Sequence, residues 1–324
     1  MDTNLARLVP SAPAEPENFT DSLVAGLRKA PKEIACKFFY DEMGSRLFDA
    51  ICELPEYYQT RTETALLKRH AGEIAALMGR EAEIVEFGAG SLRKVRILLD
   101  AAQNPYAYTP LDISGDYLQE VVRALAVDYP ALVLRPVVGD FTRPLEIPDL
   151  PGRNSKMSRR AGFFPGSTIG NFKPDAAMAL LRRMRASLNG GGLLIGVDLV
   201  KDPLRLHAAY NDAAGVTALF NKNLLARANR ELGADFELDA FAHYAPYNAS
   251  AHRIEMYLVS LKRQSVTLGG QHFEFAQGEP VHTEDSHKYT IESFREMACR
   301  AGFNPRAVWT DEERLFSLHW LESR

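Results

Sequence analysis

Residues 82–90 read AEIVEFGAG, a short apolar run that ends in two glycines. Such a run is typical of a buried strand in a parallel sheet. The glycines allow a tight turn and a close approach of the backbone to a ligand, although a plain turn between a strand and a helix would look the same. A dinucleotide-binding turn requires a small residue at position 93, where this chain has Arg93. The stretch therefore predicts the first unit of an α/β sheet and argues against a nicotinamide-dependent oxidoreductase.

The same alternation continues on the carboxyl side of this stretch. Strands are expected at residues 82–87, 106–113, 132–138, 161–164 and 192–199, and helices at 92–102, 114–129 and 174–188. Five strands separated by helical segments are typical of a doubly wound, Rossmann-like parallel sheet.

The pattern changes beyond residue 200, which indicates an insertion. The expected elements there are a mostly helical stretch at 204–232, antiparallel strands at 253–262 and 271–275 around the Gly269-Gly270 turn, a helix at 290–301 and a closing hairpin at 308 and 315–321. Upstream of the sheet, helices are expected at 21–28, 44–54 and 62–78. We predict that residues 61–200 and 286–324 form the sheet domain, and that residues 1–60 and the insertion 201–285 form a second α+β domain.

The composition excludes several classes of protein. With 38 basic and 42 acidic residues the net charge is −4, which argues against a polybasic nucleic-acid binder. Three cysteines without a CxxC pair argue against a zinc ribbon or a disulfide framework, and no apolar run is long enough to predict a membrane span. We expect a cytosolic monomer without a metal and without a nucleic-acid or membrane partner. The basic run 153–160 is expected to be a solvated loop.

Residues suited to a nucleoside stand where the predicted strands end. Asp112 ends the second strand and can accept both ribose hydroxyls, while Asp140 and Phe141 end the third and can contact an adenine. Asp112 would also serve as a helix cap, and Asp140 as a surface acid beside a core Phe141. Because carboxyl ends of parallel strands share one sheet edge, the three positions together favour S-adenosylmethionine, a nucleoside ligand without phosphate.

Several longer segments resemble the histidine Nα-methyltransferase family of ergothioneine biosynthesis. The resemblance extends over nearly the whole chain from about residue 20. The segments that carry it are KFFYD at 37–41, LPEYYQTRTE at 54–63, GSTIGN at 166–171, DLVKD at 198–202, YNDAAGVT at 210–217 and RIEM at 253–256.

The resemblance implies a class I methyltransferase domain with a second, substrate-binding domain. It implies transfer of three methyl groups from S-adenosylmethionine to the α-amine of L-histidine, giving hercynine and S-adenosylhomocysteine. The cofactor residues it implies are Gly88, Lys94, Asp112, Asp140, Phe141 and Tyr40. The substrate residues it implies are Tyr57, Asn171, Tyr210, Glu284 and Ser286, with Tyr40 and Asn171 at the site of methyl transfer. The Ser91 and Asp112-Ile113-Ser114 positions depart mildly from the family pattern.

Other functions fit parts of the same pattern. The family also contains N-methyltransferases of prenylated tryptophan, so the substrate could be another aromatic amino acid or a histidine derivative. A catalytically silent nucleoside-binding module is a further alternative. The polar pair Glu284 and Ser286 favours an imidazole over an indole, because polar groups reject a ligand that leaves them unpaired. Transfer to an amine requires a neutral nucleophile, and we hypothesise that water or Tyr40 relays the released proton.

Overall fold

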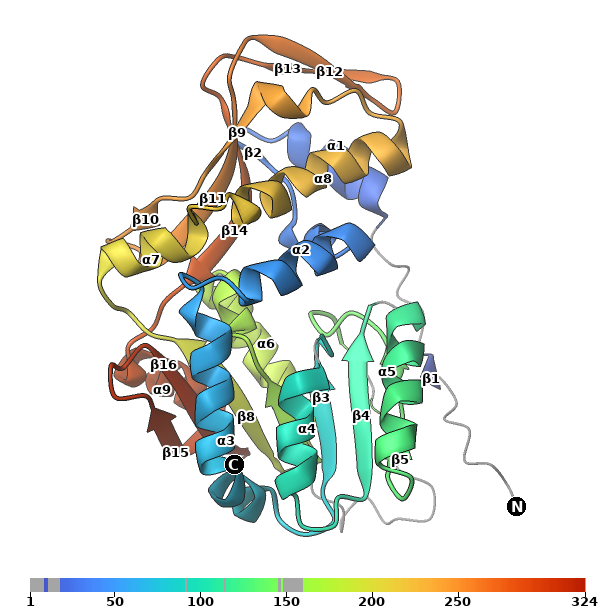
Figure 1. The fold of residues 1–324 in the computed structure, drawn as a ribbon, viewed down its shortest axis with the longest axis vertical. Helices are drawn as coiled ribbons and strands as arrows, with labels where there is room; N and C mark the ends of the chain where they lie inside the picture. Colours follow the sequence, from blue (N-terminus) through green and yellow to red (C-terminus); the bar gives the residue numbers. More distant parts are fainter. Residues whose placement is uncertain are drawn as a thin grey trace.

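The stretch 82–90 forms the centre of a large sheet, shown in the computed structural model of Figure 1. The structure describes residues 9–10, 18–90, 92–113, 115–144, 147 and 160–323. Ser91, Ser114 and residues 153–159 lie outside the described residues, so the expectations for them stay predictions. Among the described residues, no helix is both long and apolar enough to cross a membrane.

The order of the strands confirms the predicted doubly wound sheet. The order is β1-β6-β4-β3-β7-β8-β16-β15, and β5 also pairs with β4. All pairs from β1 to β8 are parallel, whereas β16 runs antiparallel to β8 and β15. The strands are β1 (Val9–Pro10), β3 (Glu83–Phe87), β4 (Ala107–Asp112), β5 (Val133–Leu134), β6 (Val137–Val138), β7 (Arg160–Phe164), β8 (Gly192–Asp198), β15 (Phe303–Thr310) and β16 (Phe316–Ser323). The chain order reverses at β3, which is where ligands bind in open α/β sheets.

Helices cover both faces of this sheet. One face packs on α3 (Tyr58–Met78), α4 (Leu92–Ala101) and α5 (Gly115–Asp128) around a core that includes Ile84 and Phe163. The other packs on α6 (Pro174–Ser187) and α9 (Ile291–Arg300) around a core that includes Val85 and Phe164. Neighbouring residues of a strand point to opposite faces of the sheet, so Ile84 and Val85 belong to different cores. Figure 1 shows α3 and α4 in front of the strands.

A second sheet lies beyond the carboxyl edge of the first (Figure 1). Its order is β10-β11-β14-β2, with β9 also paired to β11. The strands are β2 (Lys32–Glu33), β9 (Phe241–Tyr244), β10 (Tyr247–Asn248), β11 (Arg253–Ser260) and β14 (Pro280–His287). Its core joins residues of the N-terminal segment to residues of the insertion. The associated helices are α1 (Phe19–Leu27), η1 (Cys36–Phe39), α2 (Glu42–Cys52), η2 (Thr168–Asn171), α7 (Pro203–Tyr210), α8 (Val216–Leu232) and η3 (Leu238–Ala240).

Several predicted elements need correction. The Gly269-Gly270 turn joins β12 (Gln264–Leu268) to β13 (Gln271–Phe275), a separate two-stranded sheet, while the expected partner at 253–262 pairs with β14. The stretch 204–232 is mostly helical, as predicted, and consists of α7 and α8. The side chain of Asp212 accepts hydrogen bonds from the backbone N–H groups of Val216 and Thr217 at the start of α8. The third predicted strand is split into β5 and β6, and α3 begins four residues earlier than expected.

The basic run also departs from its prediction at its last residue. Arg160 is buried at the start of β7, where its Nε lies 2.9 Å from the Glu83 carboxylate. Its other nitrogens donate to the backbone carbonyls of Ser187 and Ile147. A buried guanidinium is tolerated here because its donors are matched by a charge and by carbonyl groups.

Candidate active site

The turn after β3 brings Gly88 against Phe141. Gly88 has φ of +74°, and a Cβ added there would lie 3.3 Å from the Phe141 ring. A side chain at position 88 would therefore be both strained and crowded. Phe141 in turn meets Phe164 edge to face, with ring centroids 5.6 Å apart. The two predicted cofactor residues thus form one surface, with a bare backbone beside an aromatic ring.

Two carboxylates lie at the same edge of the sheet. Asp112 is the last residue of β4, and Asp140 follows the adjacent β6. The backbone N–H of Gly139 donates to the carbonyl of Asp112 at 2.9 Å, which ties the two strand ends together. Lys37 reaches within 4.0 Å of Asp140 from the N-terminal segment. Carboxylates, an aromatic ring and an exposed backbone suit the hydroxyls and base of a nucleoside, so the residues fit S-adenosylmethionine.

Lys94 completes this edge through an acid that sequence analysis missed. Glu63 of α3 is fully buried, and its carboxylate pairs with the Lys94 ammonium. The same carboxylate accepts the backbone N–H of Gly166 at 2.9 Å. Glu63 stands inside the recognised segment 54–63, but nothing in its spacing indicated this double contact. It links α3, α4 and the loop after β7 beside the predicted cofactor residues.

The predicted substrate residues meet on one face of β14. Glu284 and Ser286 are separated by one residue, so their side chains point to the same side of the strand. The amide Nδ2 of Asn171 donates to Oε2 of Glu284 at 3.2 Å, and the hydroxyls of Tyr210 and Ser286 lie 2.7 Å apart. The structure therefore brings together side chains from η2, α7 and β14 in one polar cluster.

Aromatic rings from the N-terminal segment stand beside this cluster. The Tyr57 ring meets Tyr210 edge to face at 6.5 Å, and Phe48 meets both Tyr57 and Tyr40. Tyr40 also packs on Phe220 of α8, with centroids 5.8 Å apart. Tyr40 remains 44% exposed, so its ring is held by packing while part of it stays open. These contacts place Tyr40 and Tyr57 next to the polar cluster.

The surroundings change the acidity of the site groups. Burial raises the pKa of Glu284 to about 7, because the charged form loses water. The pKa of Tyr40 is raised well above its ordinary value, first by desolvation and then by the negative charge of Glu284. The Tyr40 hydroxyl therefore keeps its proton at neutral pH, which argues against its acting as a free base and leaves it the role of a relay.

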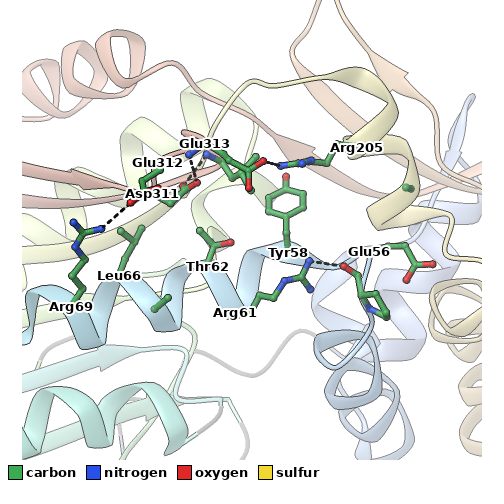
Figure 2. A pocket seen from close by; sticks show the side chains of 14 residues that line it. Glu56, Tyr58, Arg61, Thr62, Leu66, Arg69, Arg205, Asp311, Glu312 and Glu313 are labelled. Carbon is green, nitrogen blue, oxygen red and sulfur yellow. Dashed lines mark hydrogen bonds and ion pairs between the residues drawn. The ribbon is translucent and has the colours of Figure 1, made fainter.

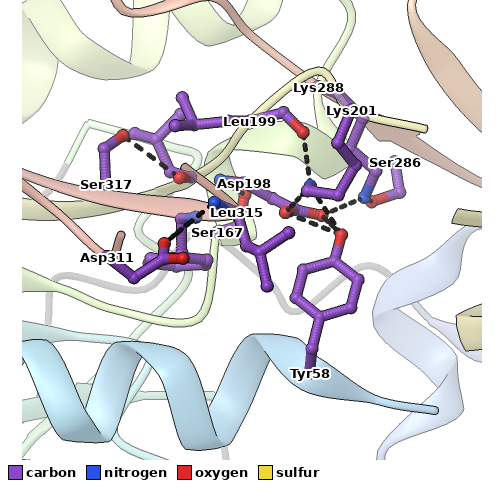
Figure 3. Close-up of polar contacts among 12 residues, drawn as sticks. Tyr58, Ser167, Asp198, Leu199, Lys201, Ser286, Lys288, Asp311, Leu315 and Ser317 are labelled. Carbon is purple, nitrogen blue, oxygen red and sulfur yellow. Dashed lines mark hydrogen bonds and ion pairs between the residues drawn. The ribbon is translucent and has the colours of Figure 1, made fainter. Parts of the chain in front are cut away.

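A buried network of charges contacts Ser286 of this cluster through Lys288 (Figure 3). The fully buried Asp198, at the end of β8, contacts Nζ of Lys288 at 2.8 Å and Nζ of Lys201 at 2.5 Å. The Tyr58 hydroxyl donates to the same carboxylate at 2.9 Å. Burial would raise the pKa of Asp198, but the two positive charges hold it below its usual range. Asp198 is therefore charged at neutral pH.

Sequence analysis assigned no role to this network, although signals for it exist. Tyr58, Asp198 and Lys201 stand in the recognised segments. Lys288 follows Glu284 and Ser286 at the same spacing of two, so the alternation of a strand places it on the same face.

A pocket of about 680 Å³ opens on the other side of Tyr58, between α3, α7 and the loop before β16 (Figure 2). None of the residues predicted for the site lines it. Its Arg205 pairs with Glu313 at 2.7 Å, and Arg61 donates to backbone carbonyl groups, including that of Leu54. Among the described residues, no group of three or more His, Cys, Asp or Glu side chains is placed to hold a metal ion.

The comparisons with known proteins agree with this geometry. Over residues 19–323 the chain matches the sequence profile of a family described as histidine-specific, SAM-dependent methyltransferases. The chain belongs to this family. It is 42% identical over 300 residues to the histidine N-alpha-methyltransferase of Mycolicibacterium smegmatis, with 91% of each chain covered. It is 29% identical over 302 residues to ergothioneine biosynthesis protein 1 of Neurospora crassa, with 91% of this chain and 33% of that protein covered.

A solved structure shares the fold of this family member. It is described as a possible exported protein from Bordetella parapertussis, with a TM-score of 0.52 and 11% identity over 96% of this chain and 99% of that one. At this identity the likeness concerns the fold alone. Family membership and the strand order together confirm the predicted class I methyltransferase fold and the dependence on S-adenosylmethionine.

Proposed function

We propose that this enzyme transfers three methyl groups from S-adenosylmethionine to the α-amine of L-histidine, the first step of ergothioneine biosynthesis. One observation carries the proposal. Glu284 and Ser286, on one face of β14, are hydrogen-bonded to Asn171 and Tyr210, which makes a polar cluster beside the predicted cofactor edge. Family membership and the names of the relatives support the same substrate.

The residues have distinct roles within this proposal. Gly88, Lys94, Asp112, Asp140 and Phe141, with Tyr40, would hold S-adenosylmethionine, which supplies a methyl group on a positively charged sulfur. Asn171 would offer a donor to the substrate carboxylate, and the Tyr210 hydroxyl would donate to Ser286. Glu284 and Ser286 would hydrogen-bond to the imidazole. The Tyr57 ring packs against Tyr210 at the edge of the cluster.

Positioning accounts for most of the chemistry that these residues can perform. The amine must lie about 3 Å from the methyl carbon and in line with the bond that breaks, and such orientation contributes on the order of 7–11 kcal/mol. The positive sulfur is already a good leaving group, so no covalent intermediate with the protein is required. Tyr40 would pass the proton of the amine to water; its ring contacts with Phe48 and Phe220, beside the cluster, support this role.

The domain arrangement follows as part of the proposal. Residues 61–200 and 286–324 would form the cofactor domain, and residues 1–60 with 201–285 the substrate domain. The distribution of the strands from β2 onward supports this division, although β14 extends two residues past the boundary and β1 pairs with β6 of the first sheet. A monomeric state and a cytosolic location stay predictions from the sequence.

Mass spectrometry of the products provides the test. We expect purified protein with S-adenosylmethionine and L-histidine to give a product heavier by three methyl groups, with no methylation of tryptophan. Turnover of another amino acid in place of histidine would contradict the assignment of Glu284 and Ser286. Binding of S-adenosylhomocysteine without turnover of any amino acid would favour the silent nucleoside-binding module.

A further inference from the structure

Lys288 contacts two hydroxyls of the proposed substrate site, those of Tyr210 and Ser286. Its side chain is completely buried, and its Nζ lies 2.9 Å from the Tyr210 hydroxyl and 2.8 Å from that of Ser286. The third contact of Nζ is the Asp198 carboxylate at 2.8 Å. An ammonium has three N–H donors and no acceptor. All three donors of Lys288 are therefore used within the protein, as Figure 3 shows for Ser286 and Asp198.

The ammonium determines where the hydroxyl hydrogens can point. Both hydroxyl oxygens accept from Lys288, so neither hydroxyl can donate back to it. The oxygens of Tyr210 and Ser286 are 2.7 Å apart, and one hydrogen lies between them. The pair holds two hydrogens, so one remains, whichever hydroxyl donates to the other. Among the described residues, neither hydroxyl has another hydrogen-bond partner.

Glu284, on the same face of the strand, offers a hydrogen-bond acceptor where the hydroxyl pair offers a donor. Its carboxylate accepts one hydrogen bond, from Asn171 to Oε2, and its other oxygen has no partner among the described residues. An acceptor and a donor thus lie two residues apart on one face of the strand, where one small polar ring can contact both.

We propose that Lys288 is a positioning residue for substrate recognition. Its ammonium, held by Asp198, orients the hydroxyls of Tyr210 and Ser286 so that one hydrogen faces the substrate, opposite the accepting carboxylate of Glu284. The site then selects a neutral ring with one N–H and one acceptor nitrogen. This inference rests on the proposed function. It adds the residue that lets the site distinguish a ring with an acceptor nitrogen from a ring without one.

The charge of Lys288 is maintained by its surroundings. Burial opposes the charged form, but the carboxylate of Asp198 outweighs burial and raises the pKa of Lys288. Lys201 shares Asp198 yet touches neither hydroxyl, and its nitrogen bonds to Tyr58 and to the carbonyl of Leu199 instead. Lys201 therefore provides a matched control, because its loss disturbs the same buried carboxylate without touching the hydroxyl pair.

The test compares L-histidine with its two pyrrole analogues, 3-(pyrrol-2-yl)alanine and 3-(pyrrol-3-yl)alanine, which keep one ring N–H and lack the acceptor nitrogen. In the unmodified protein we expect kcat/KM for histidine to exceed that of the better analogue at least 100-fold, because the analogue leaves a hydroxyl unpaired. In Lys288→Met the ratio should fall below about 5-fold, mainly through a higher KM for histidine. Lys201→Met should keep the ratio, and S-adenosylhomocysteine should bind all three proteins equally by calorimetry.

Each other outcome has a defined meaning. If Lys288→Met loses activity on histidine and on the analogues in equal proportion, Lys288 serves the fold alone and the inference is wrong. If this variant does not fold, Lys288→Gln is measured in the same way, because its amide fills the site without a charge and Asp198 stays paired with Lys201. Failure of both variants to fold would assign Lys288 to the fold and overturn the inference. If the unmodified protein does not methylate histidine, the proposed function itself fails.

Discussion

Burial of Glu284 lowers the stability of the folded protein, although the side chain also belongs to the proposed substrate site. Its pKa is about 7 in the folded protein because burial penalises the charge. In the unfolded chain the pKa of a Glu is about 4.3. The unfolded chain therefore releases its proton first as the pH rises, and the free energy of unfolding falls between these two values. Above pH 7 the loss amounts to about 4 kcal/mol at most.

Glu284→Gln should accordingly make the ligand-free protein more stable at pH 8 and little different at pH 4. Thermal unfolding at the two pH values measures this. In the unmodified protein we expect KM for histidine to increase below pH 7 as Glu284 takes up a proton. Glu284→Gln should raise KM for histidine and remove this pH dependence. Since histidine itself is identical in both assays, the difference between the two pH profiles isolates Glu284. Equal stability of the two proteins at pH 8 would contradict a raised pKa at this position.

Tyr40 provides a second prediction for a single residue. Its hydroxyl keeps its proton at neutral pH, so it can pass a proton on but cannot store one. Each of the three transfers releases one proton, because the amine is protonated in solution and only its neutral form attacks the methyl group. Tyr40→Phe should slow all three transfers about tenfold, including the third when Nα,Nα-dimethylhistidine is supplied. This effect is smaller than the roughly 100-fold of a full general base, because water can still take the proton. Full turnover at every step would show that water relays the proton alone.

Helix α9 begins with a capping box. The Thr290 hydroxyl accepts the backbone N–H of Ser293, and the Ser293 hydroxyl accepts that of Thr290, which forms a capping box. Thr290→Ala should lower the free energy of unfolding by about 1 kcal/mol, whereas Thr290→Ser should keep most of it. Denaturant titration measures both. Because α9 packs behind the main sheet, KM for histidine should not change in either variant.

The same scale shows what the sequence could and could not predict. Strands such as β3 and β8 are recognisable because both of their faces are buried, which leaves a continuous apolar run. The Gly269-Gly270 turn was correctly expected as a turn, but its strands could not be paired, since β11 pairs with β14 rather than with the nearest strand. Pairing of distant strands depends on contacts that local periodicity does not contain.

The site was predictable to a similar extent. Asp112 and Asp140 could be placed because strand ends share an edge in a parallel sheet. Glu284 and Ser286 required the family resemblance, since a short run of polar residues late in the chain has no local signature. Glu63 and Asp198 were missed because their partners lie 31 and 90 residues away in sequence, at Lys94 and Lys288.

At the scale of the whole molecule, the substrate cluster depends on the core of the second sheet. That core joins the N-terminal segment to the insertion, two parts separated in sequence by strands β3 to β8 of the cofactor-binding sheet. Phe39 stacks on Phe220 at 4.5 Å within it, one residue before Tyr40. Phe275 is equally buried in the same core but packs on Phe236 and Phe241 instead. The two phenylalanines therefore share burial and differ in their connection to the site.

This difference allows stability and positioning to be separated. Phe39→Leu and Phe275→Leu should each lower the free energy of unfolding by on the order of 1–2 kcal/mol, because each leaves part of a buried ring volume unfilled. Phe39→Leu should also raise KM for histidine several-fold, since it loosens the packing beneath Tyr40, and Phe275→Leu should not. Denaturant titrations and steady-state kinetics on the same preparations compare the two effects. Equal KM values in the two variants would mean that Tyr40 is held by Phe48 and by its own backbone rather than by the core that joins the two parts of the chain.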